Sequence, residues 1–229
     1  REDGDGDTVV VSDQIDLATT SESVFAFDDD GPTLTVTADA EASAALAVEL
    51  DETEGADRAN GAGEVADGNS DDTGPGLGQV TTTVSGGLTG LFTLGGDFGS
   101  DLAGTDTGVL SFVGIPGGGL LSTLSATNGG AITLFATSST LITGEDAGGD
   151  TVFTIEIVDV GGGVFQLQTT LFEALDHGAD GNLFDASLPL LVTSGEVQLQ
   201  YEVTREDGDG DTVVVSDQID LATTSESVF

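Results

Sequence analysis

The sequence has no cysteine, no methionine, no tryptophan and no lysine. Without cysteine it has no disulfide, no thiolate metal ligand and no thiol nucleophile. Positive charge is scarce too, because three arginines stand against 42 aspartates and glutamates and the formal net charge is −39. Such a chain is a poor partner for nucleic acid or an anionic membrane, and its self-repulsion opposes a compact state unless cations bind or screen it. A divalent cation is therefore the first partner to expect.

Long apolar runs and catalytic side chains are also missing. No run approaches the roughly 18 apolar residues of a membrane span, so we expect no membrane insertion. The single histidine, His177, follows Asp176 and precedes Gly178, and a catalytic role would need a partnered nucleophile or metal cluster that no pattern marks. Paired carboxylates for glycoside cleavage usually come with aromatic platforms for the sugar. We expect a structural histidine in a turn and no enzyme.

The chain repeats itself. Residues 1–25, the first copy, are identical to residues 205–229, the second copy. A sequence that repeats in this way is typical of a tandem array whose units are structural modules. We expect residues 1–27 to be the last strand and linker of a preceding repeat, and residues 28–229 to be one full repeat.

Short apolar blocks with period-two alternation predict β-strands. Hydrophobic residues make up 38% of the chain and include 11 phenylalanines, which argues against the disorder that the charge alone would predict. Residues 8–17 alternate as a half-buried strand should. The other apolar blocks are 33–37, 44–50, 80–84, 88–94, 109–113, 132–136, 141–142, 152–158, 164–172, 188–192 and 197–203. The pattern predicts an all-β fold, an enlarged Ig-like antiparallel β-sandwich of about eleven to thirteen strands.

Two stretches interrupt the blocks. Residues 51–78 form an acidic insert of Gly, Ala, Asp, Glu and Asn, and residues 114–130 are rich in glycine. A structureless insert as long as residues 51–78 is either functional or mobile. A period of 204 residues fits one enlarged sandwich or two stacked ones, and we favour one, with both stretches as its elaborations, because no second Asp-Gly linker appears near the middle of the period.

The strongest chemical motif is the acidic loop, Asp207-Gly208-Asp209-Gly210-Asp211. Calcium takes six to eight oxygen ligands, which several carboxylates on a bendable backbone supply well. The helix-flanked calcium loop would need Gly at its sixth position and Glu at its twelfth, but these positions hold Thr212 and Gln218. The Gly-Gly-x-Gly-x-Asp repeat of the calcium β-roll does not match either, because the acids here are out of phase with it and occur once per 204 residues. An irregular calcium loop between strands remains, with a solvated acidic turn as the alternative.

Strand length decides which acids can share an ion. A strand of about ten residues is some 30 Å long, so the acids on either side of residues 8–17 lie too far apart. In a sandwich, however, the loop before the last strand lies at the end where the chain enters. We therefore expect a calcium clamp between the incoming linker and the module. The predicted ligands are Asp28, Asp29, Asp30, Asp207, Asp209 and Asp211, with Asp3, Asp5 and Asp7 as the corresponding loop of the preceding module.

Other acids are weaker candidates for a second site, since a solvated loop is the simpler interpretation of each. They are Asp51, Glu52 and Glu54; Glu145, Asp146 and Asp150; and Asp176, Asp180 and Asn182.

At this point a family resemblance emerges, and it covers most of the period. The motifs that carry it are Gly195-Glu196-Val197, Tyr201-Glu202-Val203-Thr204, the acidic loop with Thr212, and Phe27-Asp28-Asp29-Asp30-Gly31-Pro32. They resemble the repeats of giant bacterial RTX adhesins. The resemblance implies an extracellular module on a Gram-negative cell surface, exported unfolded by type I secretion and folded by calcium outside. Such Ig-like extenders hold distal binding domains away from the cell in adhesion and biofilm formation.

Two functions imply different partners. A structural extender contacts neighbouring repeats of the same chain. The alternative, a calcium-dependent binding module built from the 51–78 insert or the 114–130 stretch, would bind a sugar or a protein.

Residues 1–25 carry a last strand without its sheet, and an exposed strand edge tends to pair with another chain. We expect them to add to a neighbouring molecule or to compete with residues 205–229 for the same place, as in domain swapping.

Overall fold

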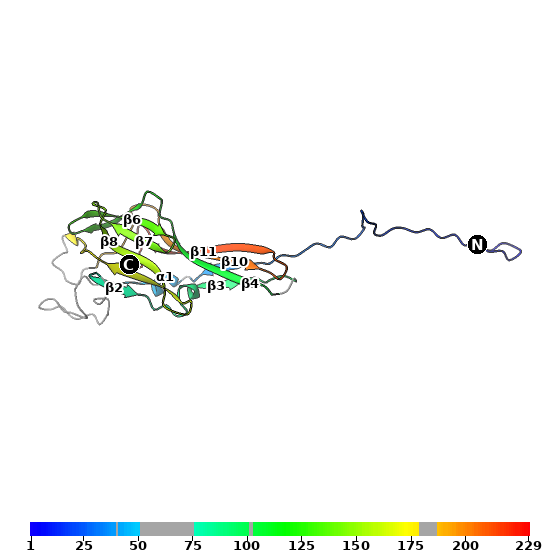
Figure 1. Ribbon diagram of the computed structural model, residues 1–229, viewed down its shortest axis with the longest axis horizontal. Helices are drawn as coiled ribbons and strands as arrows, with labels where there is room; N and C mark the ends of the chain where they lie inside the picture. Colours follow the sequence, from blue (N-terminus) through cyan, green and yellow to red (C-terminus); the bar gives the residue numbers. More distant parts are fainter. Residues whose placement is uncertain (40, 51–75, 101–102, 179–186) are drawn as a thin grey trace. The chain divides into compact units, whose positions relative to one another are not determined.

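The computed structural model describes residues 1–39, 41–50, 76–100, 103–178 and 187–229 (Figure 1). Most of the predicted acidic insert, residues 51–75, lies outside the described residues. The chain divides into two units, Arg1–Asp30 and Gly31–Phe229. Each unit is described by itself.

The second unit is all-β, as predicted. Its described residues contain eleven strands, one turn of α-helix and one turn of 3-10 helix. The elements are β1 (Thr35–Ala38), α1 (Ala42–Ala45), β2 (Gly78–Thr81), η1 (Leu88–Leu91), β3 (Phe92–Gly95), β4 (Thr105–Val113), β5 (Leu120–Ala126), β6 (Gly130–Ser138), β7 (Leu141–Glu145), β8 (Thr151–Asp159), β9 (Phe165–Leu171), β10 (Val197–Glu206) and β11 (Thr212–Ala222). Neither helix of the described part is long or apolar enough to cross a bilayer.

The strands form three antiparallel sheets. The largest has the order β2-β9-β8-β7-β6-β5, the second has the order β11-β10-β4, and β1 pairs with β3. Strands β5 to β9 follow one another as a meander, whereas β10 lies between β4 and β11 and so joins distant parts of the sequence. The predicted antiparallel sandwich is confirmed.

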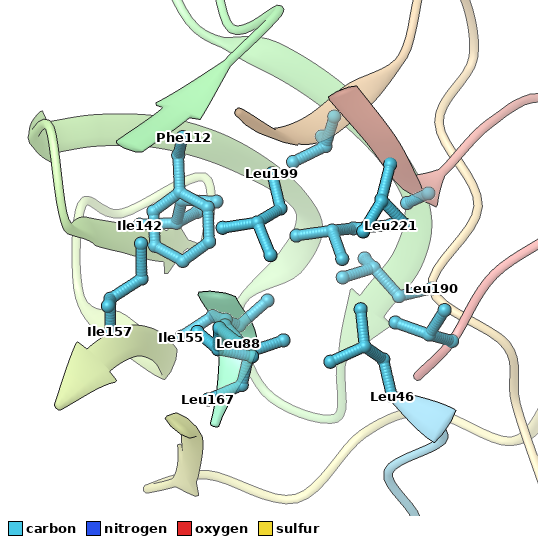
Figure 2. Packing of buried hydrophobic residues seen from close by; sticks show 14 of the residues in the cluster. Leu46, Leu88, Phe112, Ile142, Ile155, Ile157, Leu167, Leu190, Leu199 and Leu221 are labelled. Carbon is cyan, nitrogen blue, oxygen red and sulfur yellow. The ribbon is translucent and has the colours of Figure 1, made fainter. Parts of the chain in front are cut away.

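One hydrophobic core joins the sheets (Figure 2). Leu167 of the large sheet, Leu199 of β10 and Leu221 of β11 are fully buried members of it. The inward face of β10 follows the predicted period of two, because Val197, Leu199 and Val203 are buried while the residues between them are half-buried or exposed. Arg205 continues this face at the end of the strand, so the apolar core ends at a buried cation.

Residues 114–130 are not only a glycine-rich elaboration, and that prediction was wrong in part. They contain β5, which forms one edge of the large sheet. Inward positions of β5 hold Leu120, Ser122 and Leu124, while Leu121 is exposed. The polar Ser122 on the inward face and the apolar Leu121 on the outward face hide the alternation from a composition-based reading.

Residues 44–50 form no strand, contrary to prediction. They begin within α1, whose sequence Ala-Ser-Ala-Ala has a strong local preference for helix. Leu46 and Val48 are nevertheless buried, and the Val48 N–H donates to the Val228 carbonyl at 2.7 Å. The block 188–192 also lacks a strand and makes one isolated bridge, between Ser122 and Val192. In both blocks apolar residues are buried in the core without a continuous ladder of strand hydrogen bonds.

Residues 8–17 form no strand in the first unit, so that prediction was wrong for this chain. Val10, Val11 and Ile15 are more than four-fifths exposed. The same residues in the second copy form β11, which pairs with β10 over its length. A half-buried strand needs a neighbour to satisfy its backbone and cover its apolar face. The pattern correctly indicates strand propensity, but among the described residues only the second copy has a sheet partner.

The turns of the repeated segment form in both copies. Thr19 N–H donates to the Glu22 carbonyl at 2.6 Å, and Thr223 N–H donates to the Glu226 carbonyl at 2.8 Å. Isolated bridges join Ala18 to Ser23 and Ala222 to Ser227. These turns are therefore determined by local sequence, whereas the strand between the turns depends on its sheet.

The two copies provide matched positions for a stability measurement. Leu221 is 0% exposed and the identical residue Leu17 is 53% exposed. We expect Leu221→Ala to lower the free energy of unfolding by about 3 kcal/mol, because it leaves a cavity in the core. Leu17→Ala should change it by less than about 0.5 kcal/mol. Urea unfolding followed by circular dichroism at fixed calcium concentration measures both, and equal losses would contradict the assignment of β11 to the second copy.

Candidate metal centre

The acidic loop connects β10 to β11 at one end of the second sheet. Asp207, Asp209 and Asp211 each place a carboxylate oxygen so that these oxygens lie within 4.8 Å of one another. Asp209 and Asp211 are exposed, whereas Asp207 is only 5% exposed. A cluster of three carboxylates, one buried and two exposed, offers the hard oxygen ligands that calcium prefers.

Asp207 organises the loop through one of its two carboxylate oxygens. Its Oδ1 accepts hydrogen bonds from the backbone N–H groups of Gly210 at 3.1 Å and Asp211 at 2.8 Å. The Asp207 N–H donates to the Asp211 carbonyl at 3.0 Å. Gly210 has φ of 107°, a conformation that favours glycine. The alternation of Asp and Gly therefore has a structural cause at this position.

The other oxygen of Asp207 is the unusual one. Oδ2 is buried and makes no hydrogen bond to any described residue. Burial alone would raise the pKa of Asp207, but a hydrogen bond with the Asp209 side chain and the backbone N–H groups of the loop outweigh it and lower this pKa. The side chain is thus held as a carboxylate in a place where one oxygen is shielded from water. A buried unpaired anionic oxygen is costly, and a bound cation would remove that cost.

Gly104 allows the loop to be packed in this way. A methyl group built on Gly104 would overlap the Glu206 carbonyl oxygen and would lie 2.7 Å from the Asp207 Cα. Residue 104 directly precedes β4, which pairs with β10. Only glycine lets these backbones approach so closely. Sequence patterns alone gave no sign of this contact.

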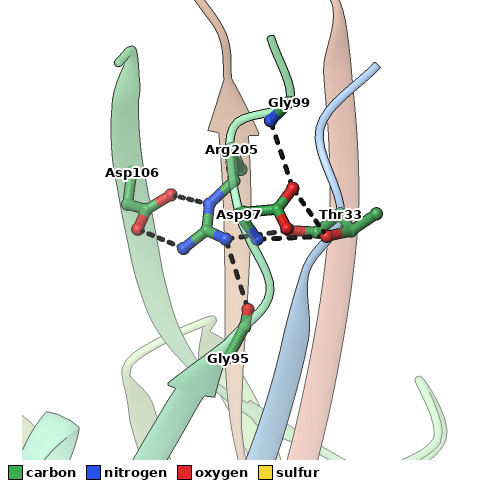
Figure 3. Close-up of polar contacts among 6 residues, drawn as sticks. All are labelled: Thr33, Gly95, Asp97, Gly99, Asp106 and Arg205. Atoms are coloured by element: carbon green, nitrogen blue, oxygen red, sulfur yellow. Dashed lines mark hydrogen bonds and ion pairs between the residues drawn. The ribbon is translucent and has the colours of Figure 1, made fainter. Parts of the chain in front are cut away.

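Arg205 holds the base of the loop to three other segments (Figure 3). Its Nε and Nη2 donate to the two carboxylate oxygens of Asp106 in β4, at 2.8 and 2.9 Å. Its Nη1 donates to the backbone carbonyls of Thr33 at 2.8 Å and Gly95 at 3.2 Å. The guanidinium also lies 4.6 Å from the centre of the Phe98 ring. A planar fork of donors suits this combination of a bidentate pair and two carbonyls.

Sequence reasoning missed Arg205 and Asp106 as site residues. The sequence did offer one signal for Arg205, because it is one of only three arginines in a chain without lysine and stands two residues before the acidic loop. Its partner Asp106 lies 99 positions away in sequence, so no local pattern connects them.

The start of the second unit lies beside the acidic loop. A Cβ built on Gly31 would lie 3.7 Å from Oδ2 of Asp211. Thr33 receives the Arg205 hydrogen bond, and its N–H donates to the Asp97 carbonyl at 2.9 Å. Asp28, Asp29 and Asp30 belong to the first unit and are exposed. Their predicted participation in one calcium site with the acidic loop stays a prediction.

The first copy folds its own acidic loop in the same way. Asp3, Asp5 and Asp7 also bring carboxylate oxygens within 4.8 Å of one another, and all three residues are exposed. The Asp3 N–H donates to the Asp7 carbonyl at 2.9 Å, as Asp207 does to Asp211. Hydrogen bonds with the Asp5 side chain and with backbone N–H groups lower the pKa of Asp3. The loop conformation is therefore determined by local sequence. The first aspartate of the loop is buried only in the second copy, where it is Asp207.

The weaker acidic candidates form no comparable cluster in the described part of the chain. Asp146 closes a similar turn, in which its Oδ1 accepts from Gly148 at 2.8 Å and Asp150 at 2.9 Å. Asp176 accepts from Gly178 at 2.8 Å. The only groups of three acids close enough to hold an ion, among described residues, are the two acidic loops. Asp51, Glu52, Glu54, Asp180 and Asn182 lie outside the described residues.

Comparison with protein families places the chain. Residues 19–222 match a family described as a domain of unknown function, DUF5801. The chain belongs to this family. Neither the curated proteins nor the solved structures contain a match. The DUF5801 match is 204 residues long, which equals the offset between residue 1 and residue 205, and it ends with the last residue of β11. The DUF5801 unit and the repeat of this chain therefore have the same length.

The Arg205–Asp106 pair makes a pH-dependent contribution to stability. We expect Asp106→Asn to lower the free energy of unfolding at neutral pH by roughly 2 kcal/mol, since it leaves a buried guanidinium unpaired while Asp106 itself is partly exposed. Arg205 lowers the pKa of Asp106 in the folded protein below its usual 3.8. The contribution is thus complete above pH 3.8 and is lost as the pH falls through the folded pKa.

The measurement is urea unfolding of both proteins between neutral and acidic pH. The difference between them should shrink as the pH falls below the usual range of an aspartate. A difference that stays constant down to the acid limit would show that the ion pair does not carry the effect.

Proposed function

We propose that this DUF5801 domain is a spacer module of a tandem array, stiffened by calcium at the junction between units. The carrying observation is the buried, unpartnered Oδ2 of Asp207 in a cluster of three carboxylates. The three carboxyl groups place oxygens within 4.8 Å of one another, so they repel when all are ionised, and a divalent cation converts this repulsion into attraction. A calcium ion there would be bound by Asp207, Asp209 and Asp211, with water or further oxygens completing its shell.

The position of the cluster supports a role at the junction. Gly31 lies against Asp211, and the Thr33 carbonyl is held by Arg205 two residues before Asp207. The segment Asp28–Asp30 directly precedes Gly31 in the chain. An ion in the acidic loop would therefore be close to the point where the linker enters the unit, and ordering that point would restrict the angle between units.

A structural role also agrees with the repeat. Modules in arrays occur as near-identical copies whose contacts are mainly with their neighbours. The alternative, a calcium-dependent binding module, had two proposed locations. One of them, residues 114–130, contributes β5 to the large sheet, which weakens the case for a binding loop there. The other, the 51–78 insert, lies largely outside the described residues.

The cellular setting follows from the resemblance to RTX adhesin repeats. We propose an extracellular extender on a bacterial surface that supports adhesion and biofilm formation after type I secretion. A net charge of −39 without cysteine keeps the chain from collapsing or crosslinking where calcium is scarce. Extracellular calcium modules bind with dissociation constants of about 10⁻⁴ to 10⁻³ M, so folding would follow export into a calcium-rich medium.

The calcium site can be tested with a pair of matched variants. Asp207→Asn combined with Asp209→Asn keeps an oxygen at residue 207 for the loop N–H groups and removes two anionic ligands. Asp3→Asn combined with Asp5→Asn makes the same change in the exposed first copy. Millimolar calcium should raise the Tm of the parent protein and of the Asp3/Asp5 variant by roughly 3–10 °C. The Asp207/Asp209 variant should lose most of this shift.

Magnesium at the same concentration serves as the control for simple charge screening, and it should produce a smaller shift. Equal calcium shifts in both variants would show that the acidic loop of the second unit is not the site. In a protein of two complete repeats, small-angle scattering with and without calcium tests the stiffening. An unchanged maximum dimension would overturn the junction role.

A further inference from the structure

One strand of the second unit has an open edge. The second sheet has the order β11-β10-β4, so β4 lies at its margin, and apart from β10 no strand of the described residues pairs with it. Residues 105–109 of β4 are all exposed, and the apolar Val109 is 56% exposed. An uncovered strand edge offers its N–H and C=O groups to another chain.

The hydrogen bonds of β10 show which backbone groups of β4 are engaged. The Asp207 N–H donates to the Asp211 carbonyl where β10 turns into β11. Backbone groups of successive strand residues point to opposite sides, so those of Thr204, three positions earlier, point toward β4. Thr204 pairs with Thr107 of β4. Thr107 and the residues in phase with it therefore bond to β10, and the residues between them face the open side.

The residues whose backbone faces the open side are Asp106, Gly108 and Leu110. The next residue of this series, Phe112, confirms the direction, because its N–H donates to the Ser139 carbonyl at 2.7 Å, away from β10. None of the other three makes a backbone hydrogen bond to a described residue on this side. The edge of β4 can therefore pair with an added strand from Asp106 to Leu110.

An apolar groove of about 250 Å³ adjoins this edge. It is lined by residues 108–110 of β4 and by Thr140, Ile157 and Phe165, among others. Pockets for small molecules usually exceed about 300 Å³, so this groove suits a single side chain better than a whole ligand. Where a strand adds to a sheet edge, such pockets receive alternate side chains and determine specificity. The groove therefore predicts an apolar side chain on the added strand.

Negative charge surrounds the edge. Glu202 pairs with Val109, and Glu206 pairs with Thr105. Both glutamates are exposed. A strand added to β4 would lie two strand spacings, roughly 10 Å, from β10, and a long cationic side chain together with a glutamate side chain can bridge that distance. The edge therefore favours a basic segment.

A second copy of this chain fits the edge poorly. Natural edge strands avoid self-pairing by lysine, proline or a bulge, but β4 contains neither residue and pairs with β10 without a bulge. Two copies joined through β4 would bring like charges together in molecules of net charge −39. Like charge thus protects the edge from a second copy, and it attracts a cationic partner.

We propose that the edge of β4 from Asp106 to Leu110 binds an extended basic segment of another protein by strand addition. An apolar side chain of that segment enters the groove beside residues 108–110, and its lysines or arginines lie toward Glu202 and Glu206. This site goes beyond a spacer role, because it gives each unit of an array a docking edge along its side.

Synthetic peptides of alternating lysine and leucine test the proposal with the full chain at fixed calcium concentration. On titration, the amide NMR signals of Asp106, Gly108 and Leu110 should shift, because their N–H groups acquire acceptors. A peptide with glutamate in place of lysine should cause no shift. The lysine peptide methylated at every backbone nitrogen should bind at least about tenfold more weakly, because it cannot donate to the edge.

Two results of the titration would overturn the proposal. Equal affinity of the methylated peptide would show that charge and apolar contact act without strand addition. Dimers of the protein alone that pair through β4, with no response to the lysine peptide, would identify a second copy as the occupant.

A matched pair of variants locates the site. Val109 in β4 and Val214 in β11 are 56% and 55% exposed, so Val109→Lys and Val214→Lys change the charge equally at opposite margins of one sheet. Val109→Lys should weaken binding of the lysine peptide about tenfold, and Val214→Lys less than about twofold. Circular dichroism and Tm check that both variants fold. Equal weakening by the two would show general attraction to an acidic protein and would contradict a site at β4.

Discussion

The hydrogen bonds of the buried Arg205 guanidinium hold together the end of the domain that carries the acidic loop. The guanidinium binds Asp106 of β4 through two hydrogen bonds and the carbonyls of Thr33 and Gly95 through Nη1. These groups belong to the incoming segment, to β3 and to β4, and Arg205 itself ends the inward face of β10. One cation therefore joins the parts of the chain that must meet for the acidic loop to have a fixed base.

The charge of Arg205 is paired with Asp106 and with no carboxylate of the acidic loop among the described ion pairs. Its ion pair is with Asp106, at 2.8 Å, and the three carboxylates of the loop are two to six residues further along. Asp207 stays ionised because neighbouring hydrogen bonds lower its pKa, while its Oδ2 has no described hydrogen-bond partner. A chain with net charge −39 has few cations of its own to offer. Hydrogen bonds thus organise the loop around Asp207 but leave its buried Oδ2 without a described partner, which is the physical reason for proposing a metal ion.

The repeated segment shows which features sequence can predict. The acidic loop and the Thr19–Glu22 turn depend on hydrogen bonds between residues within four positions of each other, and they form in both copies. Residues 8–17 and 212–221 have the same alternation, but in the part of the chain that the structure describes only the second copy is paired in a sheet. Period two therefore predicted strand propensity and could not predict pairing. The contacts of Arg205 with Asp106 and of Gly104 with Glu206 join distant positions and leave no periodic trace. In β5 the inward Ser122 and outward Leu121 obscured a strand that the sheet itself determines.

Strand β11 connects the two ends of the second unit in a single element. It begins at the acidic loop, where Gly31 enters beside Asp211, and it ends at Ala222, whose neighbours return along the strand through Ser227 and Val228. A tension applied along an array would enter at Gly31 and leave after Phe229, and would act along β11 rather than across it. The hydrogen bonds between β10 and β11 would then be loaded together, since they lie side by side along the strand. The same arrangement that anchors the acidic loop at one end therefore places the β10–β11 ladder in the path of such a load.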